Sequence, residues 1–385
     1  MIKITDKSKC CGCGACYNIC PNNSILMKID NEGFYYPHVN IETCLNCNLC
    51  NQVCPKENNY QKNKDYKYFF IGGYNRNKEI LKQSSSGGIF WLLAEYIISC
   101  KGFVYGVELG ENFYLFHNRA TTLEECEKFR KSKYLESDMN TIYRKVRLDL
   151  DNNSKVLFTG TPCQIAGLYS YLGKEYSNLY TCDVVCHGVP SRVVFNKYIE
   201  ELNIVKKTKA ISICWRDKEN GWGPNKVAVY FDNGTQVRTI SMKNPYQKGF
   251  LINLFLRPSC YTCSWAKLPR VGDISLADFW GYKGKLLKKN VNEGLSIIIV
   301  SSEKGKTLFE EIKKFLEYEF VSEKFVTMKS RHVYMPPKKN SNREAFFKDF
   351  NKYSFEKLSK KYIYNITLRK ILSAIKWEIY KIIKK

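Results

Sequence analysis

Eight cysteines near the start of the chain form two runs with identical spacing. Both runs read C-x2-C-x2-C-x3-C-P, with Cys10, Cys13, Cys16, Cys20 and Pro21 in one and Cys44, Cys47, Cys50, Cys54 and Pro55 in the other. This pattern is typical of paired 4Fe-4S clusters, in which three closely spaced cysteines hold one cluster and the fourth cysteine of the run ligates the other. We therefore predict a first cluster on Cys10, Cys13, Cys16 and Cys54, and a second cluster on Cys44, Cys47, Cys50 and Cys20.

Two other uses of these cysteines fit the sequence less well. Zinc also binds C-x2-C pairs, but a zinc site needs only two pairs and would leave the third cysteine and the C-P unit of each run unexplained. A disulfide framework is disfavoured because the chain starts MIKITDKSKC, with no apolar stretch that could act as a secretory signal, so we expect a reducing cytoplasm. Cys11 has no assigned role, because two adjacent cysteines cannot easily ligate one cluster.

The 385 residues are enough for two or three domains. The cysteine runs predict a ferredoxin-type domain at 1–60, and a polar linker follows at 61–67. From 68 to 330, strand-like and helix-like stretches alternate, which predicts a larger mixed domain of the α+β or α/β class. The longest apolar stretch is too short to span a bilayer.

Two further cysteines lie in turns between predicted elements. Residues 155–158 and 180–185 read as buried strands, and each leads through a short turn into an apolar-periodic helix. Cys163 lies in the first turn and Cys186 in the second. Because ligands bind at the carboxyl ends of strands in open α/β sheets, both cysteines occupy positions suited to a ligand.

Cys260 and Cys263 form an isolated C-x2-C pair. Alone, this pair is equally compatible with half a zinc site, a redox pair or two buried thiols. Together with Cys163 and Cys186 it supplies four thiolates, enough for a third cluster, although the spacing does not show this grouping. The remaining downstream cysteines are predicted to be small buried hydrophobic residues: Cys100, Cys126, Cys182 and Cys214.

Several short motifs together carry a family resemblance. They are SSSGG at 84–88, KSKY at 131–134, GTPCQ at 160–164, CDVVCHGVPS at 182–191, and the later segments RPSCYTC and DISLADFWG. With the cysteine runs, they make the chain resemble the coenzyme F-420 hydrogenase/dehydrogenase beta-subunit family from Lys9 to about residue 330. The VCHGVPS and ADFWG forms look closer to the bacterial members associated with cell-surface polysaccharide genes than to the archaeal members that use deazaflavin.

The resemblance implies an iron-sulfur flavoprotein whose larger mixed α/β domain binds flavin and a further cluster. Mapped by motif, a third 4Fe-4S cluster falls on Cys163, Cys186, Cys260 and Cys263. The FAD-binding positions fall on Ser85, Ser86, Gly87, Gly88, Lys133 and Tyr134. Without the resemblance, the SSSGG segment reads as an ordinary serine N-cap with a glycine turn, and KSKY reads as a solvated turn. No catalytic side chain is assigned.

The expected activity is that of a flavin- and iron-sulfur-dependent oxidoreductase, because clusters move single electrons whereas flavin also exchanges pairs. The expected partners are a ferredoxin or a redox partner subunit, and a deazaflavin coenzyme or another small-molecule acceptor. One alternative is a non-catalytic electron-transfer subunit of a larger complex. Another is a redox-sensing or nucleic-acid-binding protein, but nucleic acid is not expected because no aromatic-interleaved RNA-binding motif is present.

Residues 331–385 form a basic tail. The last 57 residues carry half of the net charge of +24. From Leu368 to Ile383 the apolar residues follow helical spacing with lysines between them. An amphipathic helix peripheral to the inner face of the membrane and a terminal helix docked on the protein's own surface explain this pattern equally well.

Overall fold

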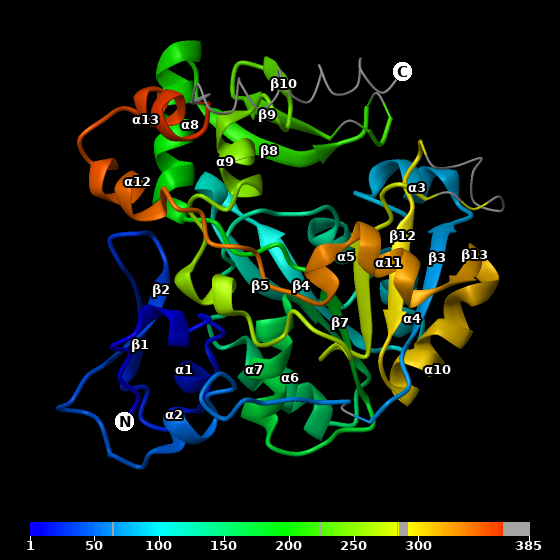
Figure 1. Ribbon diagram of the computed structural model, residues 1–385. Helices are drawn as coiled ribbons and strands as arrows, with labels where there is room; N and C mark the ends of the chain where they lie inside the picture. Colours follow the sequence, from blue (N-terminus) through cyan, green and yellow to red (C-terminus); the bar gives the residue numbers. More distant parts are fainter. Residues whose placement is uncertain (64, 220, 224, 283, 285–291, 365–385) are drawn as a thin grey trace.

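The computed structural model describes residues 1–364 except 64, 220, 224, 283 and 285–291 (Figure 1). The amphipathic pattern predicted from Leu368 to Ile383 lies outside these residues. Within the described residues, no helix is long and apolar enough to cross a membrane.

The N-terminal unit is small and built around its cysteines (Figure 1, blue). It contains two short helices and an antiparallel hairpin: α1 (Ala15–Ile19), β1 (Ile25–Ile29), β2 (Tyr35–Val39) and α2 (Leu49–Gln52). Its core is made of Ile2 and Ile25 packed against Cys16, Cys50 and Cys54. With so little apolar surface to bury, the unit depends on the cysteine loops for its interior.

The larger part of the chain is organised around a mixed eight-stranded sheet in the order β13-β3-β12-β11-β7-β6-β4-β5. The strands are β3 (Phe69–Asn75), β4 (Phe103–Leu109), β5 (Leu115–Ala120), β6 (Val156–Gly160), β7 (Leu179–Val184), β11 (Ile274–Asp278), β12 (Ser296–Val300) and β13 (Leu316–Val321). The four central strands β4, β6, β7 and β11 run parallel, and the outer strands pair antiparallel. The predicted mixed α/β class is confirmed.

Helices cover both faces of this sheet. They are α3 (Lys78–Gln83), α4 (Ile89–Ser99), α5 (Leu123–Cys126), α6 (Ile142–Asp151), α7 (Pro162–Leu172), α10 (Glu303–Ile312) and α11 (Glu323–Lys329). Strand β6 shows how the faces divide: Leu157 packs with α4 and α10, whereas Val156 and Phe158 pack with α6 and α7. This alternation follows from the two-residue period of a strand. Cys182 lies in the α4 and α10 layer, as a buried strand residue should.

A second layer, made of a smaller sheet and its own helices, packs beside the eight-stranded sheet. Its antiparallel sheet consists of β8 (Ala210–Asp217), β9 (Lys226–Phe231) and β10 (Gln236–Ile240). Its helices are α8 (Arg192–Lys206), α9 (Pro245–Leu251), α12 (Arg343–Asp349) and α13 (Phe355–Tyr362). Trp215, Tyr246 and Phe255 lie in its core together with Phe346 and Leu358. Part of the basic segment after residue 330 is therefore packed core.

Short 3-10 helices complete the described elements. They are Lys7–Lys9, Glu111–Phe113, Glu127–Phe129, Pro258–Thr262, Lys313–Phe315 and Arg331–Val333. The predicted strands that precede Cys163 and Cys186 are present as β6 and β7, and each leads into a helix, α7 and α8.

The N-terminal unit is attached to the larger part by contacts from several elements. Arg144 of α6 donates to the carbonyl oxygens of Asn18 (2.7 Å) and Cys20 (3.0 Å). Lys56 donates to the carbonyl of Thr262 at 2.6 Å. These contacts hold the cysteine loops of the small unit against the body of the protein.

Candidate functional site

Five cysteines of the N-terminal unit line one cavity: Cys10, Cys13, Cys16 and Cys54, together with the unassigned Cys11. The cavity has a volume of about 340 Å³ including space open to solvent. Ile2, Ile4 and Met27 are among the apolar residues of its wall. The structure thus brings Cys54 from the second run to three cysteines of the first run, which is the set expected for the first cluster.

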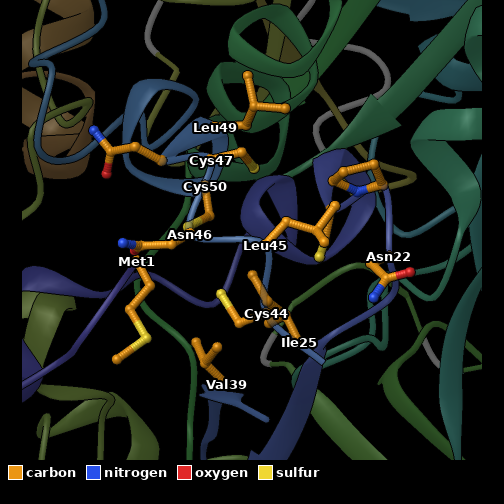
Figure 2. Close-up of a pocket in the computed structure, with 13 residues that line it drawn as sticks. Met1, Asn22, Ile25, Val39, Cys44, Leu45, Asn46, Cys47, Leu49 and Cys50 are labelled. Carbon is orange, nitrogen blue, oxygen red and sulfur yellow. The ribbon is translucent and has the colours of Figure 1, made fainter. Parts of the chain in front are cut away.

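The other four cysteines line a second cavity of about 370 Å³, again including space open to solvent (Figure 2). They are Cys20, Cys44, Cys47 and Cys50, with apolar neighbours Met1, Ile25, Val39 and Leu45. Cys47 is exposed, in contrast to the buried Cys13 and Cys16 of the first cavity. The second cavity therefore lies nearer to solvent.

Both cysteine runs need left-handed backbone at the same two positions. Gly12 and Gly14 have φ of 72° and 75° in the first run, and Asn46 and Asn48 have φ of 51° and 62° in the second. Glycine and asparagine are the residues that adopt this conformation most readily. These positions let each loop turn inward. Gly14 and Asn48 are the N-cap residues, directly after which α1 and α2 begin.

The four downstream cysteines also meet. Cys163 lies in the first turn of α7, Cys186 follows β7, and Cys260 lies on the 3-10 helix Pro258–Thr262, just before Cys263. Burial and then the neighbouring charge of Cys163 raise the pKa of Cys186 to about 12. Burial and the charges of the other three cysteines raise the pKa of Cys260. Four thiolates in one buried place repel one another, and iron bound to them relieves that repulsion.

Hydrogen-bond donors point at these sulfurs. The Val189 amide donates to Cys260 Sγ at 3.3 Å, and Thr161 Oγ1 lies 3.1 Å from Cys163 Sγ. Among the described residues, no three His, Cys, Asp or Glu side chains converge closely enough to hold a single metal ion. The candidate sites are instead groups of four cysteines, which is the ligand number of a 4Fe-4S cluster.

Cys11 connects the first cavity with the downstream group. Its thiol is hydrogen-bonded to Cys13 on one side and to Cys163 on the other. The bond to Cys13 and burial raise the pKa of Cys11, whereas the bond to Cys163 lowers it, and the net shift is upward. The same neighbourhood is tight at Gly167 of α7, where an added Cβ would lie 2.9 Å from the Cβ of Cys13 and 3.0 Å from its sulfur. Sequence spacing could not indicate this position for Cys11, because the contact depends on how α7 packs on the N-terminal unit.

The two segments predicted to bind FAD lie side by side. The Ser132 amide donates to Ser85 Oγ at 2.8 Å, which joins the SSSGG loop to the KSKY segment. Ser86 donates to the Leu295 carbonyl at 2.8 Å, and the Gly87 amide donates to the Ser296 hydroxyl at 2.9 Å. These bonds fix the loop against β12 at the N-terminus of α4.

Gly88, Lys133 and Tyr134 lie around the same loop. Gly88 is the N-cap residue of α4 with φ of 75°. Lys133 Nζ donates to the Arg130 carbonyl at 2.8 Å, and burial lowers the pKa of this lysine to about 7. The Tyr134 ring lies 5.0 Å from the Phe250 ring. A half-buried lysine with a lowered pKa favours an anionic ligand, because a bound anion would stabilise its charged form.

Residues from β8 and the loop after it also reach the SSSGG loop. Arg216 and Trp222 donate to the Ser85 carbonyl at 3.4 and 3.0 Å, and Lys218 donates to the Ser86 carbonyl at 3.2 Å. Burial, and then the charge of Arg216, lower the pKa of Lys218 to about 8. The Trp222 ring stacks on Trp280 with centroids 3.9 Å apart.

No sequence motif indicated Arg216, Lys218 or Trp222, although Trp280 lies in the DISLADFWG segment. In the same motif, Asp278 forms an ion pair with Arg216. The cations around the loop outnumber the carboxylates paired with them, so the site fits the diphosphate of a dinucleotide.

An aromatic series links this site to the downstream cysteines. His187 directly follows Cys186, and its ring lies 4.7 Å from Phe250, which contacts Tyr134. The His332 ring lies 4.5 Å from His187. The downstream cysteine group and the predicted flavin site are therefore neighbours.

Comparisons with known proteins find two matching segments in the chain. Residues 153–324 match the family described as the C terminus of the coenzyme F420 hydrogenase/dehydrogenase beta subunit. Residues 9–58 match the 4Fe-4S dicluster domain. The predicted resemblance is thus confirmed, and the chain is an iron-sulfur electron-transfer protein related to the F-420 hydrogenase beta subunit.

Two individual proteins are similar to parts of the chain. An uncharacterized ferredoxin from Methanocaldococcus jannaschii is 42% identical over 41 residues, which are 11% of this chain and 52% of that protein. The chain thus spans about half the length of this curated relative. A chain of the F420-reducing [NiFe] hydrogenase complex from Methanosarcina barkeri is similar with a TM-score of 0.47 and 16% identity, over 75% of this chain and 94% of that chain.

Proposed function

We propose that this protein is a cytoplasmic oxidoreductase that relays electrons through three 4Fe-4S clusters to FAD and on to a small-molecule acceptor. The observation that supports this most is the spatial series of the sites. The second cavity shares the N-terminal unit with the first, Cys11 links the first cavity to the downstream cysteines, and His187 and Phe250 link those cysteines to Tyr134.

Electrons from outside would arrive at the second cluster. Cys47 is exposed there, and two exposed apolar side chains lie nearby in the chain: Ile41 at 71% and Leu45 at 65%. Exposed apolar side chains beside a redox centre suit a short-lived complex with another electron carrier. The partner is therefore a ferredoxin or a redox subunit that docks over the second cavity.

The flavin site would be held by cations beside the SSSGG loop. When bound, FAD supplies the conversion between single electrons and a two-electron exchange with the acceptor. Arg216, Lys218 and Lys133 would bind its diphosphate, and the Ser85 to Gly88 loop would position it at the start of α4. The acceptor is a deazaflavin coenzyme or another small molecule. No side chain has to act as a nucleophile.

A single-turnover experiment tests the order of the relay. In Cys163→Ala the two clusters of the N-terminal unit and FAD should remain, but flavin reduction by a reduced bacterial-type ferredoxin should slow by at least tenfold. Cys100→Ala is a matched control, because Cys100 ends α4 and contacts Lys155 just before β6, whereas Cys163 follows the other end of β6. Flavin reduction at the wild-type rate in Cys163→Ala would contradict the proposal.

A further inference from the structure

Arg257 is a fully buried cation at the junction of the two parts of the protein. It immediately precedes the 3-10 helix that carries Cys260, and its side chain is 0% exposed. Its guanidinium group reaches 247 residues back along the chain to Cys10, a predicted ligand of the first cluster. Such a charge is costly to bury, so its partners show what it does.

The partners include the sulfur of Cys10. Arg257 Nη2 lies 3.6 Å from Cys10 Sγ, and Nε donates to the Cys10 carbonyl at 2.8 Å. Nη2 also donates to the Tyr35 carbonyl at 2.6 Å, and Nη1 donates to Glu136 Oε1 at 2.7 Å. The planar fork of the guanidinium makes these contacts together, which a lysine cannot do.

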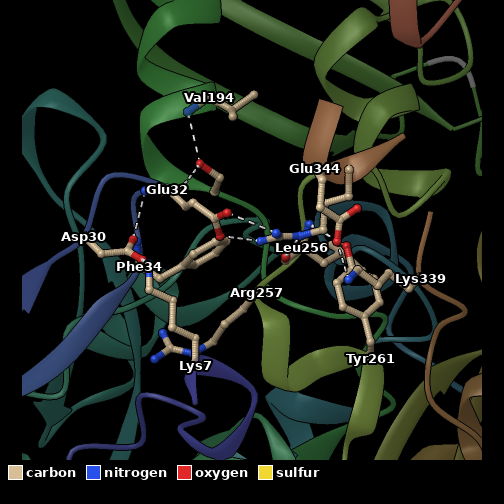
Figure 3. A network of polar contacts seen from close by, with 12 residues as sticks. Lys7, Asp30, Glu32, Phe34, Val194, Leu256, Arg257, Tyr261, Lys339 and Glu344 are labelled. Atoms are coloured by element: carbon tan, nitrogen blue, oxygen red, sulfur yellow. Dashed lines mark hydrogen bonds and ion pairs between the residues drawn. The ribbon is translucent and has the colours of Figure 1, made fainter. Parts of the chain in front are cut away.

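A nearby arginine shows what a purely structural contact looks like. Arg343 of α12 forms an ion pair with Glu32 in the β1–β2 turn and donates to the Leu256 carbonyl at 3.1 Å. Figure 3 shows Glu32 and Leu256 in this network, with Arg257 beside it. Arg343 joins the same two parts of the protein, but it contacts a carboxylate, a carbonyl and aromatic rings.

The second cavity has a different set of donors to its sulfurs. The Ile2 amide donates to Cys50 Sγ at 3.2 Å, and the Ser24 amide donates to Cys20 Sγ at 3.2 Å. These donors are neutral. The first cavity adds a full positive charge in a buried place, where its effect on a nearby charge is large.

We propose that Arg257 raises the reduction potential of the first cluster above that of the second, with Glu136 as the counter-charge that limits the effect. This inference rests on the proposed function, because it requires a cluster on Cys10. A cluster gains one negative charge on reduction, and hydrogen bonds to its sulfurs together with nearby charge set its potential. The buried cation therefore favours electrons moving inward from the exposed second cluster to the first.

EPR-monitored redox titration of the anaerobically purified full-length protein tests this directly. Arg257→Gln should make the first cluster at least tenfold harder to reduce, a downward shift of about 59 mV for a one-electron couple. For the other clusters, the equilibrium constant for reduction should change less than threefold. The control Arg343→Gln breaks the neighbouring docking ion pair and should leave all midpoints unchanged.

Glu136→Gln gives a shift of opposite sign. It removes the counter-charge but keeps Arg257, so the first cluster should become easier to reduce. If Arg257→Gln loses the first cluster, the midpoint potential of that cluster in Glu136→Gln tests the role of Arg257 instead. An unshifted midpoint in the variants that keep the cluster, or an equal shift in Arg343→Gln, overturns the role of Arg257. Wild-type protein without 4Fe-4S clusters would instead overturn the proposed function.

Discussion

If FAD binds as proposed, its affinity should depend on pH through two half-buried lysines at the predicted flavin site, Lys133 and Lys218. In the protein without flavin, burial lowers the pKa of Lys133 to about 7 and that of Lys218 to about 8. A bound diphosphate favours the charged ammonium form of both and raises both pKa values. Binding is therefore accompanied by proton uptake, and the affinity must fall as the pH rises through this range.

The magnitude follows from the fraction of each lysine that is charged before binding. Between pH 7 and pH 9 the charged fraction of Lys133 falls from about one half to about one hundredth, roughly 50-fold. That of Lys218 falls from about nine tenths to about one tenth, roughly tenfold. If both ammonium groups contact the diphosphate, the dissociation constant should rise by up to about 500-fold over this interval.

The assay is a titration of flavin-free protein, with its clusters intact, by FAD at constant ionic strength from pH 6 to pH 9, followed by quenching of flavin fluorescence. Lys133→Met should reduce the pH effect to about tenfold, and Lys218→Met should reduce it to about 50-fold. Lys174→Met is the control, because its side chain is 65% exposed and lies near Asp151. A flat profile in the wild type, or equal flattening by the control, would refute the assignment of these lysines to the flavin.

Three further predictions concern the cysteine cavities. Cys54→Ala should remove the first cluster and spare the second, which iron analysis and EPR can show; loss of the second alone would contradict the crossed ligand sets. Gly167→Ala should lower the free energy of unfolding by about 1–2 kcal/mol in denaturant titrations, because overpacking against the first cavity outweighs the gain in helix propensity. The control Gly223→Ala should not lower the free energy of unfolding, because the nearest atom is 3.9 Å from the added Cβ. Leu45→Asp should slow reduction by a ferredoxin severalfold but leave reduction by dithionite unchanged, and Leu148→Asp, at a side chain 64% exposed on α6, should affect neither.

Local spacing was enough to predict the parts of the site that depend on sequence neighbours. The spacing of the two cysteine runs predicted the two sets of four cysteines that line the cavities, because the C-x2-C-x2-C loop and its fourth cysteine have a fixed geometry. It did not predict that Cys11 also lines the first cavity. The strand and helix patterns around Cys163 and Cys186 were also sufficient to place both residues at the carboxyl ends of parallel strands.

Contacts between distant segments were not predictable in this way. Arg257 meets Cys10 across 247 residues, and Lys218 meets Ser86 across 132 residues, so no local pattern indicates either pair. The segment after residue 330 was judged by its charge, yet Phe346 and Leu358 within it are buried in the core of the second layer. Composition describes the average of a segment, whereas burial depends on which face of a helix meets the core.

The proposed relay requires three clusters and one flavin in the same chain. Anaerobic purification followed by measurement of iron, acid-labile sulfide and flavin in one sample tests this requirement. We expect about twelve iron atoms, an equal amount of sulfide and one FAD per chain, since each cluster holds four irons. About eight irons without flavin would indicate an electron carrier instead, and stoichiometric zinc in place of iron would overturn the proposed relay altogether.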